Sequence, residues 1–298
     1  MVLLKEKDRI NGLWFIKSSI LLDILFLITS NWELRKKLEF IYKKYWEIFL
    51  LISGIKKFEF GKNFVNLFGN KIFYDSPYGI AGYQSMLARQ QGMFKSIGLK
   101  DVKTIVDIGA NVGFFSMMLR ELYPDSKIYA VEPVPKIFEN LEKNLNFSQD
   151  NVFNMAMSDK CGFVKMIFDE RKSAFSHVIN SKGCKKRGDT GEIVTVSSIT
   201  LEKFCKQNSI NFIDVLKIDT EGFEANVLRG AKNILSKTRY LHIEISLEND
   251  TKYTFSEINS LLYSNNYNFQ LLFYRNFSGK GYGTITVGEF LYKNINLT

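Results

Sequence analysis

Cysteine, histidine and proline are scarce in this chain of 298 residues, which holds three cysteines, two histidines and four prolines. The cysteines form no Cys-x-x-Cys pair, which argues against a zinc ribbon and against a disulfide framework. Free thiols are typical of a reducing compartment, so we expect a cytoplasmic protein. A histidine-centred site has only two candidates, His177 and His242.

Long apolar runs and several common catalytic motifs are also lacking. The apolar run over residues 13–28 is interrupted by Lys17, Ser18, Ser19 and Asp23, and a membrane span needs about 20 residues with few charges. No signal-peptide cleavage site follows this run. The absence of a P-loop, a His-Glu-x-x-His motif and a Gly-x-Ser-x-Gly motif argues against phosphate hydrolysis, zinc proteolysis and esterase chemistry.

The overall composition is that of a globular protein with an excess of positive charge. Hydrophobic residues make up 46% of the chain and charged residues 24%, which excludes a disordered chain. Forty lysines and arginines against 31 acidic residues give a net charge of +9. Such a charge fits nucleic acid, an anionic membrane surface or an acidic substrate as partner, or solubility alone.

Residues 1–60 differ from the rest and are expected to form an N-terminal helical extension, a hairpin of two helices. The capping-box pattern Ser30–Glu33 predicts the start of the second helix, and Gly54 its end. This extension either packs on the main domain or a partner subunit, or contacts a membrane as a monotopic anchor. In the second case its aromatic residues face lipid, and a basic set faces the headgroups: Arg35, Lys36, Lys37, Lys43 and Lys44.

From residue 61 onward, predicted strands and helices alternate. Short apolar strands are expected at residues 104–108, 128–131, 152–157, 212–218 and 240–245, with helices between them. This alternation predicts an α/β domain over residues 61–298 with a parallel, doubly wound sheet. Two further strands, at 267–274 and 284–292, are joined by a glycine-rich turn and must therefore run antiparallel.

A glycine turn and two acidic residues predict a nucleoside site. The segment Asp107–Gly113 (DIGANVG) follows a strand and opens a helix, and Gly109 and Gly113 let its backbone approach a ligand closely. A carboxylate at Asp107 would repel a pyrophosphate, which argues against a dehydrogenase, and would attract an amine or sulfonium. Glu132, at the end of the next strand, is placed to accept the two hydroxyls of a ribose. S-adenosylmethionine combines these features.

Five segments carry a resemblance to a known family. They are DIGANVG at 107–113, VEPVP at 131–135, KIDTEG at 217–222, VLRGA at 227–231, and Glu244. In this order and spacing the chain resembles the FkbM family of methyltransferases from about residue 62 to 246. The resemblance implies a class I methyltransferase fold, a Rossmann-like, seven-stranded, mostly parallel sheet with one antiparallel strand near its edge. It also implies methylation of hydroxyl groups of sugars, glycans or polyketides.

The resemblance further implies which residues bind S-adenosylmethionine. Asp107, Gly109, Ala110, Asn111 and Gly113 would hold its methionine end, Glu132 with Pro133 its ribose, and Met157, Ser158 and Asp159 its adenine. Asp159 can alternatively be a plain turn residue.

Carboxylates at the ends of two neighbouring strands are the candidates for catalysis. Methyl transfer needs an aligned hydroxyl that loses its proton, and a positioned carboxylate can accept that proton. Asp219, after the fourth parallel strand, is the first candidate for base or substrate anchor. Glu221 and Glu244 can complete an acidic cluster that binds Mg²⁺ or another hard cation. A divalent metal is the less favoured reading, because Glu221 can instead cap the following helix.

Three other residues each have two readings. Lys217 either neutralises nearby carboxylates or contacts substrate. His242, on the strand face of Glu244, either belongs to this site or is a buried structural histidine. His177 lies in the basic stretch 171–192, an insertion that often covers the substrate in this fold, and is either a mobile general base or a solvated loop residue.

We therefore predict an S-adenosylmethionine-dependent O-methyltransferase that acts on a sugar hydroxyl of a glycan, glycolipid or related acceptor. The alternatives are an RNA methyltransferase and a methyltransferase of a small-molecule natural product. Base methyltransferases usually carry an Asn/Asp-Pro-Pro-aromatic loop where this chain has Asp219–Gly222, and an acidic rim opposes a phosphate chain, so nucleic acid is disfavoured. The positive charge points instead to an anionic acceptor, or to peripheral membrane contact through residues 1–60 at the cytoplasmic face.

Overall fold

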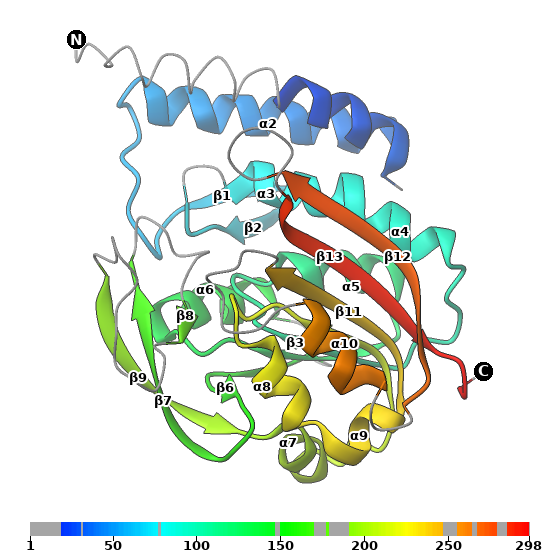
Figure 1. Cartoon of the computed structure of the whole chain (residues 1–298). Coiled ribbons are helices and arrows are strands. Elements are labelled where there is room, and N and C mark those ends of the chain that lie inside the picture. The colour runs from blue at the N-terminus through cyan, green and yellow to red at the C-terminus, as the bar shows by residue number, and fades with distance from the viewer. Residues whose placement is uncertain are drawn as a thin grey trace. The chain divides into compact units, whose positions relative to one another are not determined.

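The computed structural model describes residues 19–30, 32–76, 79–146, 150–169, 177–178, 191–246, 255–263, 267–278 and 285–297 (Figure 1). The chain divides into two compact units, Met1–Lys100 and Asp101–Thr298. The expected domain boundary, between residues 60 and 61, lies inside the first unit. A methyltransferase domain that begins at residue 61 therefore stays a prediction.

The first unit is mainly helical. A helix over residues 19–29 precedes α2 (Leu34–Ile52), a hairpin of β1 (Phe64–Leu67) and β2 (Asn70–Phe73), and the helical turns α3 (Gly79–Ser85), η1 (Met86–Gln90) and α4 (Gln91–Ser96). The capping box expected at Ser30 does not form. Helix α2 begins four residues later, with Glu33 as its N-cap and without a side-chain cap. Among the described residues, no helix is both long and apolar enough for a membrane span.

Buried polar contacts join the two N-terminal helices. The Lys44 ammonium is fully buried, pairs with Asp23, and donates to Ser19 Oγ at 2.9 Å and Gln84 Oε1 at 3.0 Å. Lys37 Nζ, also buried, donates to the carbonyl oxygen of Leu27 at 2.7 Å. The expectation that Lys37 and Lys44 face lipid headgroups is therefore wrong, because both side chains are used inside the unit.

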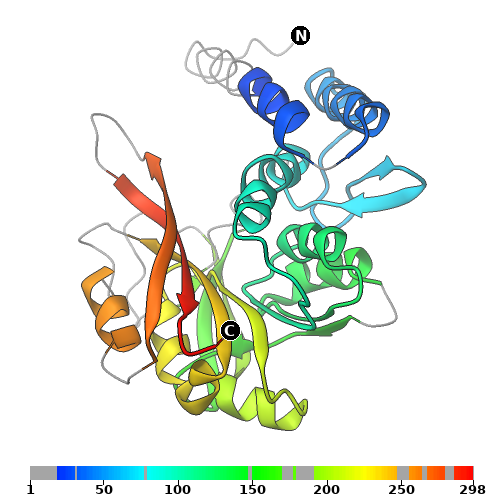
Figure 2. The same ribbon diagram turned by 90° about the vertical axis from the view of Figure 1, so that its right-hand side faces the viewer.

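The second unit is built on the sheet that the resemblance implies. Its seven strands lie in the order β12-β13-β11-β10-β3-β4-β5 (Figures 1 and 2). Six of them run in the same direction, and β13 runs antiparallel to these six. Their bounds are Thr104–Ile108 (β3), Lys127–Val131 (β4), Asn151–Phe153 (β5), Ile213–Ile218 (β10), Thr238–Ser246 (β11), Phe269–Ser278 (β12) and Ile285–Asn294 (β13). The class I methyltransferase fold, with one antiparallel strand next to the edge, is confirmed.

Helices cover both faces of this sheet. The helices are α5 (Phe114–Leu122), α6 (Pro135–Asn144), α7 (Leu201–Gln207), α8 (Glu224–Arg229), α9 (Lys232–Ser236) and α10 (Phe255–Tyr263). One apolar core joins Val106, Leu216 and Leu241 of the central strands to residues of α7–α10. Because strand side chains alternate, Asp107, Lys217 and His242 point to the opposite face. There Phe115 of α5 stacks on His242, with ring centroids 5.3 Å apart.

Two expected elements are each broken at a functional position. The strand expected over 152–157 becomes β5 and β6 (Ala156–Met157), and β6 joins a second sheet with β9 (Glu192–Ile199), β7 (Gly162–Phe168) and β8 (His177–Val178). The helix expected between the strands at 212–218 and 240–245 breaks at Gly230 into α8 and α9. A Cβ atom at Gly230 would lie 2.1 Å from the Ser158 carbonyl oxygen, so the break brings two chain segments into close contact.

Candidate active site

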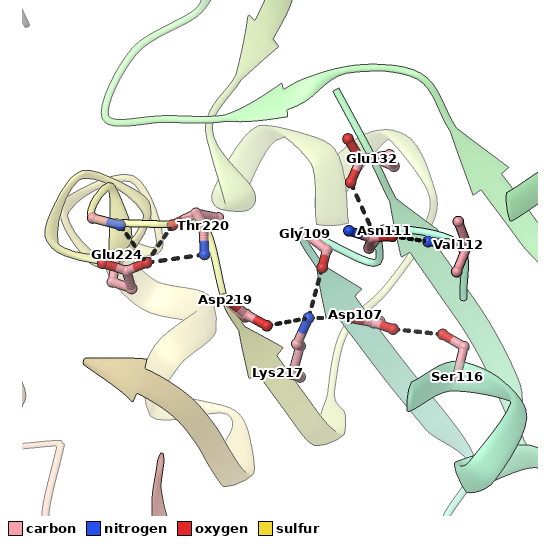
Figure 3. A network of polar contacts seen from close by, with 11 residues as sticks. Asp107, Gly109, Asn111, Val112, Ser116, Glu132, Lys217, Asp219, Thr220 and Glu224 are labelled. Carbon is pink, nitrogen blue, oxygen red and sulfur yellow. Dashed lines mark hydrogen bonds and ion pairs between the residues drawn. The ribbon is translucent and has the colours of Figure 1, made fainter. Parts of the chain in front are cut away.

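The candidate site lies at the carboxyl ends of β3, β4, β10 and β11, where parallel sheets bind ligands (Figure 3). Strand register places Asp107 of β3 beside Lys217 of β10, and Lys217 beside His242 of β11. The loops that follow these strands carry Gly109, Glu132 and Asp219.

Lys217 is the central group of the site. Its Nζ donates to the carbonyl oxygen of Gly109 at 2.6 Å, and lies 3.2 Å from Asp107 Oδ1 and 3.3 Å from Asp219 Oδ2 (Figure 3). Burial lowers the pKa of Lys217, but the two carboxylates outweigh it and hold the pKa above its ordinary value. The lysine is thus a buried cation that neutralises two acids, which supports the first of its two readings.

Asp107 contacts Ser116, in the helix after the glycine loop, and Lys217, which donates to Gly109 of that loop. Its side chain is fully buried, Oδ2 accepts a hydrogen bond from Ser116 Oγ at 2.7 Å, and Oδ1 faces Lys217. Both carboxylate oxygens are therefore already engaged with the protein. A direct contact between Asp107 and a ligand amine stays a prediction.

The glycine loop has the backbone shape that a close-fitting ligand needs. Gly109, Asn111 and Gly113 all have positive φ, at 72°, 51° and 90°. Only glycine fits the first position, because a Cβ there would lie 1.7 Å from the carbonyl oxygen of Asp219. The loop after β3 and the loop after β10 therefore touch through their backbones.

Glu132 ties the glycine loop to the loop after β4. Its Oε2 accepts from the Asn111 N–H at 3.0 Å and its Oε1 accepts from the Val134 N–H at 2.9 Å. Pro133 lies between these contacts, and Ala110 N–H donates to the Val131 carbonyl oxygen at 3.0 Å. A carboxylate oxygen accepts more than one hydrogen bond, so Glu132 retains the capacity to accept from ribose hydroxyls.

Residues 157–159 follow strand β6. Met157 and Ser158 are buried, and the Ser158 N–H donates to the Ile199 carbonyl oxygen at 2.9 Å. Asp159 is exposed. Its slight burial opposes ionisation, but hydrogen bonds from Asn226 and Ser158 outweigh this and lower the pKa of Asp159. An ionised, exposed carboxylate at this place is able to accept from an exocyclic amine.

The loop Asp219–Gly222 is held by a residue that the sequence analysis missed. Glu224 Oε1 accepts from the Thr220 N–H, the Thr220 hydroxyl and the Gly222 N–H, at 2.9, 3.0 and 3.0 Å (Figure 3). The N-cap of α8 is Phe223, without a side-chain cap, so the reading of Glu221 as the N-cap of this helix is wrong. Glu221 instead adopts a φ of 54° and lies with the acidic cluster.

Asp219, Glu221 and Glu244 do come together. Each places a carboxylate oxygen within 4.8 Å of the other two, a separation that a hard cation can bridge. The antiparallel strand β13 adds Glu289 opposite Glu244. Burial, followed by repulsion from Asp219, Glu221 and Glu289, raises the pKa of Glu244 to about 10. Without a cation, Glu244 is therefore protonated at neutral pH.

The two histidines are not part of the acidic cluster as described. His242 is placed elsewhere on its strand, and the side chain of His177 lies outside the described part of the structure. His242 is buried, 2% exposed, and stacks on Phe115, which fits its reading as a buried structural histidine. The backbone of His177 pairs with Ile167 at the edge of the second sheet. Most of the stretch 171–192, expected to be a lid, lies outside the described residues, so the role of His177 as a general base stays a prediction.

Ser116, Glu224 and Glu289 are the site residues that sequence reasoning missed. A serine in the first turn of the helix after DIGANVG, and the second glutamate of EGFE, were both visible as polar residues next to the motifs. Glu289 had no local signal, because only the pairing of β13 with β11 brings it to Glu244.

Comparison with characterised proteins gives relatives at low identity. The chain is similar to the 2-O-methyltransferase NoeI of Sinorhizobium fredii, at 25% identity over 162 residues, 48% of this chain and 63% of the relative. It is similar to the 31-O-demethyl-FK506 methyltransferase FkbM of Streptomyces tacrolimicus, at 25% over 162 residues, 46% of this chain and 62% of the relative. The hexuronic acid methyltransferase AglP of Haloferax volcanii is 22% identical over 148 residues, 49% of this chain and 57% of the relative. The chain thus spans less than two thirds of the length of each of these relatives.

A family profile covers most of the site residues, Glu289 excepted. The family described as Methyltransferase FkbM domain matches residues 107–271, more than half of the chain, and this range includes Asp107, Glu132, Asp159, Asp219 and Glu244. The strand order, the glycine loop and the acid after β4 agree with that match. The chain belongs to the FkbM methyltransferase domain family.

Proposed function

We propose that this protein is an S-adenosylmethionine-dependent O-methyltransferase whose acceptor is a sugar hydroxyl of a glycan, glycolipid or related molecule. The observation that carries the proposal is the contact between the glycine loop (Gly109–Gly113) and the acidic loop (Asp219–Gly222). Gly109 packs on Asp219, and Lys217 bridges Asp107 and Asp219. A ligand on the glycine loop would thus lie next to the candidate base.

The residues around the glycine loop fit S-adenosylmethionine. Glu132 can accept hydrogen bonds from the ribose hydroxyls and Asp159 from the adenine amine, and the N-terminus of α5 can donate backbone hydrogen bonds to the methionine carboxylate. S-adenosylmethionine bound there supplies an electrophilic methyl group. The supporting role of the buried Asp107 is to fix Lys217 and, through it, the carbonyl group of Gly109.

Asp219 is the residue best placed to act on the acceptor. Its carboxylate is partly exposed, at 29%, and is positioned by Lys217 3.3 Å away. In this role Asp219 accepts a hydrogen bond from the acceptor hydroxyl, orients its oxygen, and takes its proton during transfer. Positioned acid–base catalysis of this kind contributes roughly 10²–10⁴-fold in rate.

The acceptor class is proposed from the relatives and from charge. AglP is named for a hexuronic acid, an anionic sugar, and the net charge of +9 of this chain suits an anionic acceptor. A small-molecule natural product is the second candidate, because the relative from Streptomyces tacrolimicus is named for one. The free thiols of Cys161 and Cys205 suit a reducing, cytoplasmic location.

A methyl-transfer screen tests the proposal. The full chain is incubated with S-adenosylmethionine and panels of neutral glycans, uronic acid glycans, nucleotide sugars, polyketides and RNA, and mass spectrometry locates the transferred methyl group. We expect O-methylation of a sugar, and Asp219→Asn should lower the rate by roughly 10²-fold or more. Methylated RNA, or methylation confined to polyketides, would replace the sugar acceptor. Normal turnover by the Asp219 variant would remove the proposed base.

The acidic cluster raises the separate question of a divalent cation. Exhaustive chelation followed by an activity assay answers it, with added Mg²⁺ as the rescue. Full activity after chelation would show that Asp219, Glu221 and Glu244 act without a metal. Loss of activity with rescue by Mg²⁺ would instead assign them as oxygen ligands.

A further inference from the structure

The first unit carries large apolar side chains on the outside of its two N-terminal helices. On the helix over residues 19–29, the exposed residues are Ile20, Leu21, Ile24 and Ile28. On α2 they are Leu34, Leu38, Tyr42, Trp46 and Phe49, and every one of the nine is at least 48% exposed. We call these nine side chains the apolar face.

The spacing makes each set a continuous stripe. The five residues on α2 follow one another at intervals of four, four, four and three, and Ile20, Ile24 and Ile28 at intervals of four, which places each set on one side of its helix. The two helices are antiparallel neighbours, since Lys44 contacts Asp23 whereas Lys37 reaches Leu27 (Figure 2).

The inner side of the same helices carries buried charges next to the apolar side chains of Leu22, Phe26 and Phe40. Lys37, Lys44 and Glu47 are the buried charged residues of α2, and Asp23 is the buried charged residue of the helix before it. The Asp23 carboxylate also accepts from the Tyr45 hydroxyl at 2.6 Å and from Gln84 Nε2 at 2.7 Å. A surface helix normally turns its apolar stripe to the core and its charges to water. These helices instead bury several charges and expose a second apolar stripe, which indicates an apolar environment outside the helices.

The exposed charges of this unit are mostly positive. Among its described residues, seven exposed side chains are lysine or arginine, including Arg35, Lys36 and Lys57, and two are acidic, Glu33 and Glu59. Glu59 is moreover paired with Lys62 at 2.9 Å. A second copy of the chain carries the same positive excess in this unit, whereas an anionic surface complements it.

We infer that the apolar face binds the surface of an anionic lipid bilayer. Tyr42, Trp46 and Phe49 lie at the boundary between headgroups and acyl chains, where aromatic side chains are favoured, and Arg35 and Lys36 contact the headgroups. The helices lie in the interface, in keeping with the lack of a membrane-spanning helix among the described residues. This inference does not depend on the proposed methyl transfer.

Vesicle flotation of the full chain tests the inference. We expect the protein to float with vesicles of phosphatidylcholine and phosphatidylglycerol, and only weakly with phosphatidylcholine alone. The emission of Trp46 should shift to shorter wavelength on binding, and this shift should be absent in Trp46→Phe.

A matched pair of double variants locates the binding surface. Leu38→Gln with Trp46→Gln changes exposed positions, which folding tolerates, and should lower the vesicle partition coefficient roughly tenfold or more. Phe163→Gln with Ile193→Gln, exposed at 78% and 51% in the second unit, should leave it unchanged. Circular dichroism verifies that both variants retain the native helix content.

Three outcomes would overturn the inference. The first is no flotation with anionic vesicles, and the second is equal flotation with both kinds of vesicle, which would remove the role of charge. The third is a dimer that forms without lipid and is lost in Leu38→Gln/Trp46→Gln, because the apolar face would then join two copies of the chain.

Discussion

At the scale of single residues, one buried lysine organises the candidate site. Lys217 replaces the water that would otherwise solvate Asp107 and Asp219, and it also fixes the carbonyl oxygen of Gly109. Its partners come from two segments of the chain, Asp107 with Gly109 and the loop Asp219–Gly222, so its removal affects the glycine loop and the acidic loop together. Glu244 shows the reverse situation, because it lies among acids and is held in its protonated form.

Lys217→Met should destabilise the protein by about 3–5 kcal/mol, because it leaves the fully buried carboxylate of Asp107 without its cation. Guanidinium unfolding measures this loss. The matched control is Lys136→Met, which breaks an exposed pair with Glu192 and should cost at most about 1 kcal/mol. Equal losses in the two variants would contradict the role given to Lys217.

Glu244→Gln should stabilise the protein increasingly as the pH rises. The pKa of Glu244 is raised from 4.5 to about 10 by folding, so the stability due to its protonated form is complete below pH 4.5 and is lost as the pH rises toward 10. Glutamine does not titrate and avoids this loss. Thermal unfolding from about pH 5 to about pH 8 should show a growing advantage of the variant, by roughly 2–4 °C for each kcal/mol.

A constant difference in melting temperature across that pH range would contradict the raised pKa of Glu244. Glu257→Gln is the control, because that carboxylate is partly exposed and lies on α10, where it pairs with Arg229.

At the scale of elements, the site depends on backbones that approach without side chains between them. Gly109 meets Asp219, and Gly230 meets Ser158, so the loops after β3 and β10 and the segment after β6 are held at fixed distances. The break between α8 and α9 lies at Gly230, and the break between β5 and β6 precedes Ser158, so both breaks lie close to the second contact. Regular elements at these positions would hold the loops apart.

Gly109→Ala should abolish binding of S-adenosylhomocysteine, because the new methyl group would collide with the Asp219 carbonyl and separate the two loops. Isothermal titration calorimetry measures the binding. Gly98→Ala is the matched control, since Gly98 also has positive φ, at 61°, but has open space around its Cβ position. Both variants pay a similar backbone strain of about 1–2 kcal/mol, so retained binding in Gly109→Ala would show that the close approach is not required.

At the scale of the whole molecule, chemistry and surface contact belong to different units. The candidate active site lies within the unit Asp101–Thr298, and the apolar face lies within Met1–Lys100. The positive net charge is consistent with this division, because the exposed charges among the described residues of the first unit are mainly lysine and arginine.

Ligand binding should raise the stability of the full chain by mass action. We expect S-adenosylhomocysteine at 100 times its dissociation constant to add about 2.7 kcal/mol, and NAD to add nothing. Asp219→Ala should keep this stabilisation and lose turnover, whereas Asp107→Ala should lose the stabilisation. Differential scanning calorimetry with each ligand checks these outcomes, and stabilisation by NAD alone would argue against a methyltransferase.

The sequence by itself determined where most strands of the main sheet lie in the chain and which loops follow them. In a parallel sheet the carboxyl ends of all strands lie at the same edge, so Asp107, Glu132, Asp219 and Glu244, each at or just after such an end, were predictable as neighbours from their positions in the chain. The glycines of DIGANVG were also informative, because the ability to adopt positive φ without steric cost is a local property of glycine.

The tertiary structure alone decided which charges are buried and with which partners. Lys217 meets Asp107 across 110 positions of sequence, Glu289 reaches Glu244 only through antiparallel pairing, and Glu224, which was not among the predicted site residues, holds the loop Asp219–Gly222. In α2, helical spacing predicted the helix, but the pairing of Lys44 with Asp23 decided which side faces inward. Such choices depend on desolvation and on contacts between distant segments, which no local pattern of residues contains.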